Sequence, residues 1–222
     1  MRLPSDIQVV LFDLDGTLID HAGAARAGVL DFAAHFDLPG APEEIVRRWF
    51  AVERRWFTRF ERGKVTHAGQ RVERCREFLG RPDMSEVEAL EIYQVYLAAY
   101  RRSWQAFPDA ASALDRAFAN GRRVGVFTNG ATDMQNDKLA RTGLSRPGLV
   151  MLAATDLGAA KPQPASYAAA LERMESAEAS RSVLIGDDLN NDVRGARKAG
   201  MHAVYLDRPG GGDVASLDEV EF

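Results

Sequence analysis

The chain has few of the residues and patterns that mark several large classes of protein. Its 222 residues include one cysteine, Cys75, which excludes an internal disulfide and fits a reducing compartment. No apolar run approaches the ~18 residues of a membrane-spanning helix. The start of the sequence also lacks the basic residues, apolar stretch and cleavage site of a secretory signal. We therefore expect a cytoplasmic protein with no membrane partner.

The chain also lacks a net positive charge and has few soft metal ligands. The net charge is -4, which argues against nucleic acid as the main partner. The four histidines are scattered along the chain and form no cluster with the cysteine, so a zinc site is not expected. The hydrophobic content of 46% is ordinary for a globular protein, and the length suits one domain with an insertion or two small domains.

Short apolar runs rich in β-branched residues recur along the sequence and predict strands buried on both faces of a parallel sheet. They lie at 7–12, 124–127, 149–153, 183–185 and 203–206. Helical patterns lie between the later runs, at 110–120, 133–141, 164–174 and 192–199. This alternation predicts an α/β fold, with a doubly wound, mostly parallel (Rossmann-like) sheet.

The stretch from 21 to 104 differs, because it contains helical periodicity and no strand pattern. Helices are predicted at 43–62, 66–79 and 85–103, with a fourth beginning near residue 22. Ser85 and Glu88 form a candidate capping box for the third of these. We therefore predict an α/β domain made of 1–20 and 105–222, interrupted by an α-helical domain of 21–104.

Polar residues follow the predicted strands at the points where those strands end. In an open parallel sheet these ends meet at one edge, where ligands bind. The residues are Asp13 and Asp15 after the first run, Thr128, Asn129 and Gly130 after the second, Lys161 in the loop after the third, and Asp187 with Asp188 after the fourth.

This set of side chains predicts phosphate chemistry with a hard metal ion. Three carboxylates, those of Asp13, Asp15 and Asp187, repel one another unless a cation holds them, and oxygen ligands favour Mg²⁺. A carboxylate can attack phosphorus and form an aspartyl phosphate. Lys161 and the hydroxyl of Thr128, with nearby backbone amides, would stabilise the phosphoryl oxygens. Asp15, two residues from Asp13, is placed to act as general acid and then base.

These residues resemble the motifs of the haloacid-dehalogenase-like (HAD) superfamily, and the likeness extends over nearly the whole chain. The four matching segments begin at Asp13, Phe127, Lys161 and Gly186. The resemblance implies an Asp13 nucleophile, an Asp15 acid/base, and Mg²⁺ held by the Asp13 side chain, the Asp15 backbone carbonyl and Asp187. It implies supporting roles around the metal for Asp188 and Asp192, and substrate binding by Thr128, Asn129, Gly130 and Lys161.

The helical insertion resembles the α-helical cap of the same superfamily. The segment Gly63-Lys64-Val65-Thr66, followed by Arg74, is similar to a pattern in house-cleaning 5'-nucleotidases and in N-acylneuraminate-9-phosphatase. The segment Thr155-Asp156-Leu157-Gly158 departs from the glutamate-rich version of the nucleotidases. The expected function is Mg²⁺-dependent hydrolysis of a small phosphorylated metabolite, a nucleoside monophosphate or sugar phosphate, by a monomer or homodimer.

Other functions remain open at this point. A dehalogenase has little use for an acid at position 15, and a phosphonate hydrolase would need a lysine of the insertion, where Lys64 is the only one. Sugar phosphomutases of the superfamily tend to have an acidic residue where Gly186 stands. A non-catalytic binding module would not need the aspartates and Lys161 together. Asp187, Asp188 and Asp192 also suit a helix N-terminus.

Overall fold

The structure is a computed structural model that describes residues 1–176 and 178–222. The chain divides into two compact units, which are described separately. The first consists of Met1–Asp20 with Gln105–Phe222, and the second is His21–Trp104. No helix within the described residues combines the length and the apolar character needed to cross a membrane.

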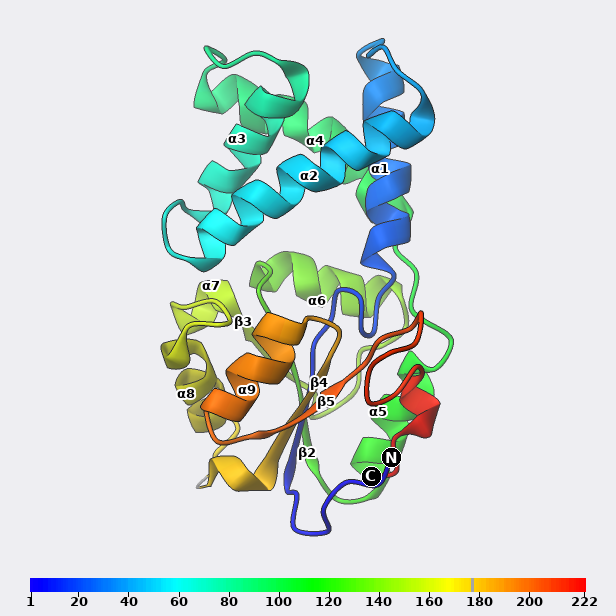
Figure 1. The fold of residues 1–222 in the computed structure, drawn as a ribbon, viewed down its shortest axis with the longest axis vertical. Helices are drawn as coiled ribbons and strands as arrows, with labels where there is room; N and C mark the ends of the chain where they lie inside the picture. Colours follow the sequence, from blue (N-terminus) through cyan, green and yellow to red (C-terminus); the bar gives the residue numbers. More distant parts are fainter. Residues whose placement is uncertain (177) are drawn as a thin grey trace. The chain divides into compact units, whose positions relative to one another are not determined.

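The first unit is built on a parallel sheet (Figure 1). Within the described residues its five strands have the order β3-β2-β1-β4-β5, and every neighbouring pair is parallel. The predicted α/β fold with a parallel sheet is therefore confirmed. The strands are β1 Val9–Phe12, β2 Arg123–Thr128, β3 Val150–Ala153, β4 Ser182–Gly186 and β5 His202–Tyr205.

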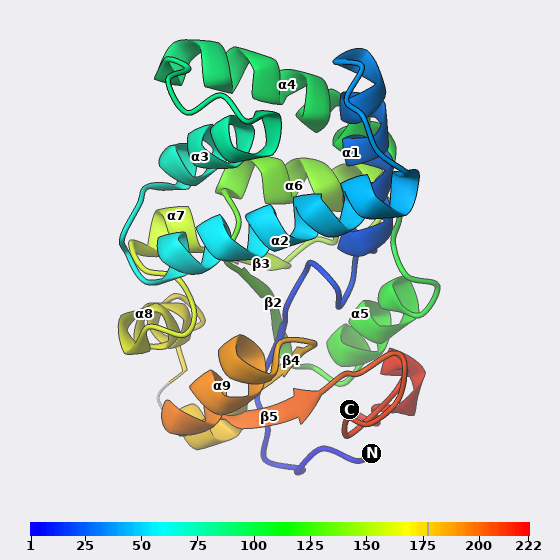
Figure 2. The ribbon, with the colours of Figure 1, turned by 45° about the horizontal axis from the view of Figure 1, so that its top comes forward.

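Helices cover both faces of this sheet (Figures 1 and 2). Alternate residues of β1 supply the two cores: Val10 and Phe12 pack with α5 and α6, whereas Val9 and Leu11 pack with α8 and α9. All four side chains are fully buried. The helices are α5 Ala110–Ala119, α6 Thr132–Arg141, α7 Ala154–Leu157, α8 Pro164–Arg173 and α9 Gly195–Lys198.

One predicted helix differs from the structure in a way that matters for the acidic residues. In place of a helix over 192–199, residues Leu189–Arg194 form a wide π-helical turn, and α9 begins only at Gly195. Asp188 is the N-cap of that turn, since its carboxylate accepts the N–H groups of Asn190 and Asn191, each at 2.8 Å. The turn returns the chain to the end of β4.

The second unit contains the helices α1 His21–His35, α2 Pro42–Glu61, α3 His67–Leu79 and α4 Glu86–Arg102. Helix α4 packs against α1 and α3, and α3 packs against α2. An aromatic cluster fills the core: the Trp49 ring lies 4.3 Å from Tyr96 and 5.0 Å from Phe78 between centroids. Ser85 caps α4 as predicted, but the Glu88 carboxylate accepts from Arg81 at 2.5 Å.

Candidate active site at the carboxyl ends of the strands

Asp13 lies at the end of the central strand β1. Its backbone N–H donates to the carbonyl of Ile185 in β4 at 2.9 Å, so the residue continues the sheet ladder and is held firmly. The side chain projects beyond the sheet, and the residue is only 8% exposed. A carboxylate in such a place has lost most of its water and needs a partner.

Lys161 supplies that partner and connects three parts of the sheet edge. Its Nζ donates to Asp13 Oδ1 at 2.8 Å, to Asp192 Oδ1 at 2.6 Å and to the Phe127 carbonyl at 2.7 Å. All three donors of the ammonium group are therefore used. The sequence predicted Lys161 as a phosphate-binding group; the structure places it between two buried carboxylates at the edge where phosphate was expected.

Asp13, Asp187 and Asp192 form a compact acidic cluster. Each offers a carboxylate oxygen, and these oxygens lie within 4.8 Å of one another. Burial raises the pKa of Asp13, and the charge of Lys161 opposes that rise while the two other aspartates add to it. Burial also raises the pKa of Asp192. Asp187 is exposed, yet burial of its carboxyl group by the surrounding protein and the charge of Asp192 raise its pKa to about 7.

The same groups suit a hard cation. Only carboxylate oxygens belong to the cluster, and the pKa values of all three carboxyl groups are raised, mainly by burial and, for Asp13 and Asp187, further by repulsion from neighbouring aspartates. A divalent ion with oxygen ligands would relieve that repulsion. The residues therefore fit Mg²⁺. Asp192, for which the sequence implied only a supporting role, is itself a member of this cluster.

Two glycines keep space free for these carboxylates. A Cβ added to Gly16 would lie 2.2 Å from Asp187 Oδ2, and one added to Gly186 would lie 2.3 Å from Asp192 Oδ2. Gly16 also has a φ of 100°, which side-chain-bearing residues rarely adopt. The acidic cluster therefore depends on the absence of two side chains as well as on three carboxylates.

Asp15 does not join the acidic cluster with its side chain but turns to α6. Lys138 Nζ donates to both of its oxygens, at 2.5 and 2.7 Å, and Gln135 Nε2 donates to Oδ2 at 3.0 Å. The sequence interpretation missed Gln135 and Lys138. For Gln135 a signal was available, because it lies four residues before Leu139 and therefore on the same face of α6.

Thr128, the last residue of β2, and Asn129, which follows it, each form hydrogen bonds with another part of the site. Thr128 Oγ1 accepts from Gln135 Nε2 at 2.7 Å, and the residue is 2% exposed. The Asn129 side-chain amide binds the backbone of Lys161 twice, accepting from its N–H at 2.7 Å and donating to its carbonyl at 2.8 Å. Asn129 therefore positions the lysine. The backbone N–H of Gly130 donates to Thr128 Oγ1 at 3.3 Å, and binding of phosphate by the N–H groups of Asn129 and Gly130 stays a prediction.

Two more residues have defined partners among the acidic side chains, Thr17 after β1 and Asp188 after β4. Thr17 Oγ1 donates to Asp187 Oδ1 at 3.2 Å and orients that carboxylate. Asp188, in contrast, uses its carboxylate to cap the following turn, while its N–H donates to Asp192 Oδ2 at 3.0 Å. Asp188 thus holds Asp192 in place through its backbone, and its predicted role near a metal stays a prediction.

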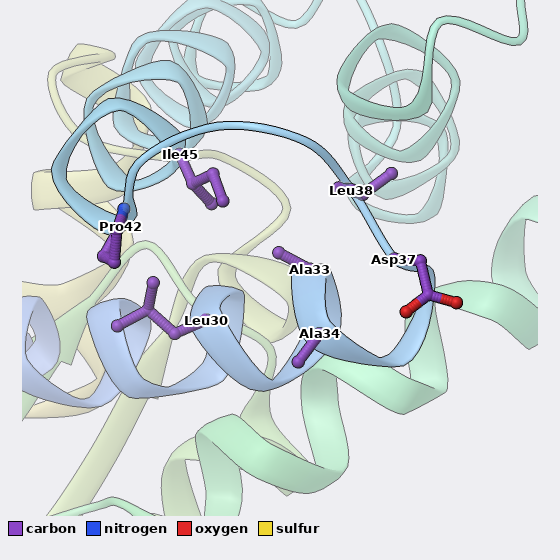
Figure 3. Close-up of a pocket in the computed structure, with 7 residues that line it drawn as sticks. All are labelled: Leu30, Ala33, Ala34, Asp37, Leu38, Pro42 and Ile45. Carbon is purple, nitrogen blue, oxygen red and sulfur yellow. The ribbon is translucent and has the colours of Figure 1, made fainter.

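A groove in the helical unit shares no residue with this acidic edge. It has a volume of about 620 Å³ and lies where α1 passes into α2 (Figure 3). Its lining is apolar except for Asp37, and it consists of Leu30, Ala33, Ala34, Asp37, Leu38, Pro42 and Ile45. These side chains supply no group for phosphate chemistry.

Both the sequence and the fold are similar to those of known proteins. A family model described as haloacid dehalogenase-like hydrolase matches residues 7–200. A phosphoglycolate phosphatase of Yersinia pestis is 32% identical over 205 residues, covering 90% of this chain and 81% of its own. A pyrimidine 5'-nucleotidase of Escherichia coli is 26% identical, with 96% and 95% covered. The crystal structure of a HAD-hydrolase from Bacillus subtilis bound to magnesium superposes with a TM-score of 0.85 at 20% identity, covering 96% of each chain.

Proposed function

The chain belongs to the haloacid dehalogenase-like hydrolase family, and from this premise we propose that it is a Mg²⁺-dependent phosphatase of small phosphorylated metabolites. One observation supports the proposal more than any other. Lys161 bridges Asp13 and Asp192, and Asp187 offers a further carboxylate oxygen within 4.8 Å. This arrangement combines a nucleophile, a cation and candidate metal ligands at the end of the central strand.

Asp13 is the proposed nucleophile. One of its oxygens attacks the phosphorus atom, the bond from phosphorus to the leaving oxygen breaks, and an aspartyl phosphate forms. Lys161 offsets the repulsion between the carboxylate and the incoming dianion, and the Thr128 hydroxyl with the nearby N–H groups stabilises phosphoryl oxygens. Bound Mg²⁺, held by the side chains of Asp13 and Asp187 and the Asp15 carbonyl, would supply further charge neutralisation.

Asp15 is the proposed general acid and base. In the first step its proton passes to the leaving oxygen, and in the second it takes a proton from the water that hydrolyses the aspartyl phosphate. Its side chain is 28% exposed, so it can exchange protons with solvent between the two steps. Asp13 and Asp15 thus divide the chemistry, because one is buried against Lys161 and the other lies near water.

The structure favours this chemistry over the alternatives within the family. A side chain at position 186, as in the family's mutases, would collide with Asp192. Lys64, the lysine that a phosphonate hydrolase would need, is exposed and belongs to the loop between α2 and α3. We further propose that 21–104 is the family's α-helical cap. The substrates named for relatives, phosphoglycolate and pyrimidine nucleotides, favour a small phosphomonoester.

The test is release of inorganic phosphate from purified protein incubated with nucleoside monophosphates, sugar phosphates, phosphoglycolate and p-nitrophenyl phosphate. Each ester is assayed with Mg²⁺ and again with excess chelator. We expect Mg²⁺-dependent release from at least one ester. Acid quenching during turnover of a radiolabelled substrate should trap phosphate on the protein, since an aspartyl phosphate forms in every cycle.

Asp13→Asn is the matching variant, because it keeps the shape of the side chain and removes the nucleophilic charge. We expect it to fold, to release no phosphate and to trap no label. Phosphate release by Asp13→Asn at near wild-type rates would assign the nucleophile elsewhere. Absence of release by the wild-type protein from every ester would refute the proposed function.

A further inference from the structure

Asp15 is fastened to the core by two residues that the mechanism above does not use. Building on the proposed function, we propose that Lys138 and Gln135 are positioning residues. They hold the carboxyl group of Asp15 in the orientation needed to give a proton to the leaving oxygen and, as the carboxylate, to take one from water. Neither residue belongs to the four segments through which the family resemblance was drawn.

The contacts fix the carboxylate on both oxygens. Lys138 Nζ lies 2.5 and 2.7 Å from Asp15 Oδ1 and Oδ2, and Gln135 Nε2 lies 3.0 Å from Oδ2. The same Gln135 nitrogen lies 2.7 Å from Thr128 Oγ1. A carboxylate held at both oxygens cannot rotate freely, and the shared amide joins its position to that of the proposed phosphate-binding hydroxyl.

The two side chains that contact Asp15 are buried, and a glycine leaves room for one of them. Lys138 is 2% exposed and Gln135 is 1% exposed, although both side chains are polar. A Cβ at Gly130 would lie 2.2 Å from Gln135 Nε2, so a larger residue there would displace the amide. The glycine that follows Thr128 and Asn129 therefore makes room for the group that orients Asp15.

Solvation of Asp15 alone does not explain the arrangement. Its side chain is 28% exposed, so water could satisfy the carboxylate without help. Burying an ammonium group is costly, and an apolar side chain of similar volume would pack in its place at lower cost. What the lysine and the amide add is a fixed direction for the carboxylate, and general acid catalysis depends on that direction.

The dependence on leaving group separates positioning from a purely structural role. p-Nitrophenolate leaves readily without a proton, whereas an alkoxide needs one as its bond to phosphorus breaks. A misdirected Asp15 should therefore slow alkyl esters much more than p-nitrophenyl phosphate. General damage to the fold would slow both esters alike.

The experiment compares kcat/KM for p-nitrophenyl phosphate and for the best alkyl phosphate substrate, in wild type, Lys138→Met and Gln135→Leu. For Lys138→Met we expect a loss of about 100-fold with the alkyl ester and of only a few-fold with the aryl ester. Gln135→Leu should show the same selectivity to a smaller degree. Lys198→Met, the same change at an exposed lysine of α9, is the matched control and should change neither value.

Equal losses for both esters, or none, in a folded Lys138→Met protein would overturn the positioning role. If Lys138→Met does not fold, Gln135→Leu decides by the same ratio. A wild-type protein that hydrolyses neither ester refutes the proposed function itself, and this inference with it. A wild-type protein that hydrolyses both while the variants keep the wild-type ratio refutes the inference alone.

Discussion

Replacing Lys161 with methionine should destabilise the protein strongly, because its ammonium group is the shared partner of two buried carboxylates. The lysine is 1% exposed, and its Nζ contacts Asp13, Asp192 and the carbonyl of Phe127 within 2.8 Å. Removing one partner of a buried ion pair typically costs about 3–5 kcal/mol, since the other charge remains unpaired. That is a large part of the ~5–15 kcal/mol by which domains are usually stable.

The pH dependence of this loss follows from the remaining carboxyls. Burial already raises the pKa of Asp13 and Asp192, and removing Lys161 removes the main group that opposes that rise. The folded state of Lys161→Met then keeps protons that the unfolded chain releases near its ordinary carboxyl pKa of ~3.9. Its stability therefore falls as pH rises above that value, so the deficit relative to wild type is largest near pH 8 and shrinks toward pH 5.

Urea denaturation without metal is the assay, followed by far-ultraviolet circular dichroism. Tryptophan fluorescence alone would mislead, because all three tryptophans, Trp49, Trp56 and Trp104, belong to the helical unit. Lys198→Met should stay within about 0.5 kcal/mol of wild type, as surface changes usually do. A loss below about 1 kcal/mol for Lys161→Met at pH 8, with unchanged denaturant slope, would refute the reasoning.

Three further predictions concern other parts of the chain. Gly186→Ala should cost about 1–3 kcal/mol in urea denaturation, because its Cβ would lie 2.3 Å from Asp192 Oδ2; unchanged stability would show that Asp192 moves freely. Asp187→Asn should raise the Tm of metal-free protein at pH 8. The pKa of the Asp187 carboxyl is raised to about 7, so the folded protein loses stability as the pH rises through that value, and the amide removes this loss. The same variant should abolish any rise in Tm on adding Mg²⁺. Burial and nearby arginines lower the pKa of His67 to about 4. As the pH falls, the unfolded chain therefore protonates this histidine before the folded protein does, and the free energy of unfolding should fall by about 2 kcal/mol between pH 6.5 and 4. His67→Asn should flatten this part of the plot of urea-denaturation free energy against pH.

Strand positions were readable because parallel strands buried on both faces leave an unbroken apolar run. Each predicted run overlaps a strand, and the errors lie at the ends. Ile7, for example, was included in the first run, but its N–H donates to the carbonyl of Pro4, and β1 begins at Val9. Its apolar side chain is buried for a different reason, since it packs in the core beneath the strand.

The sequence predicted which residues lie at the acidic edge of the sheet, but not how their side chains are held there. Position after a strand placed Asp13 and Asp187 together, because such ends meet at one edge of a sheet. The wide turn at 189–194 was not visible in the sequence, since helix periodicity does not distinguish it from an ordinary first turn. Lys138 was missed because lysine in a polar helix normally faces water, and only a partner across the fold, Asp15, explains its burial.

The central place of β1 has a consequence for synthesis on the ribosome. Val9 pairs with Arg123 on one side and with Ser182 on the other. At ~5–20 residues per second, translation reaches Arg123 roughly 6–23 seconds after Val9. The helical stretch 21–104 is synthesised during that interval, while the apolar strand β1, which precedes Asp13, has no sheet to join. We expect this strand to be the segment of the nascent chain that most needs a chaperone.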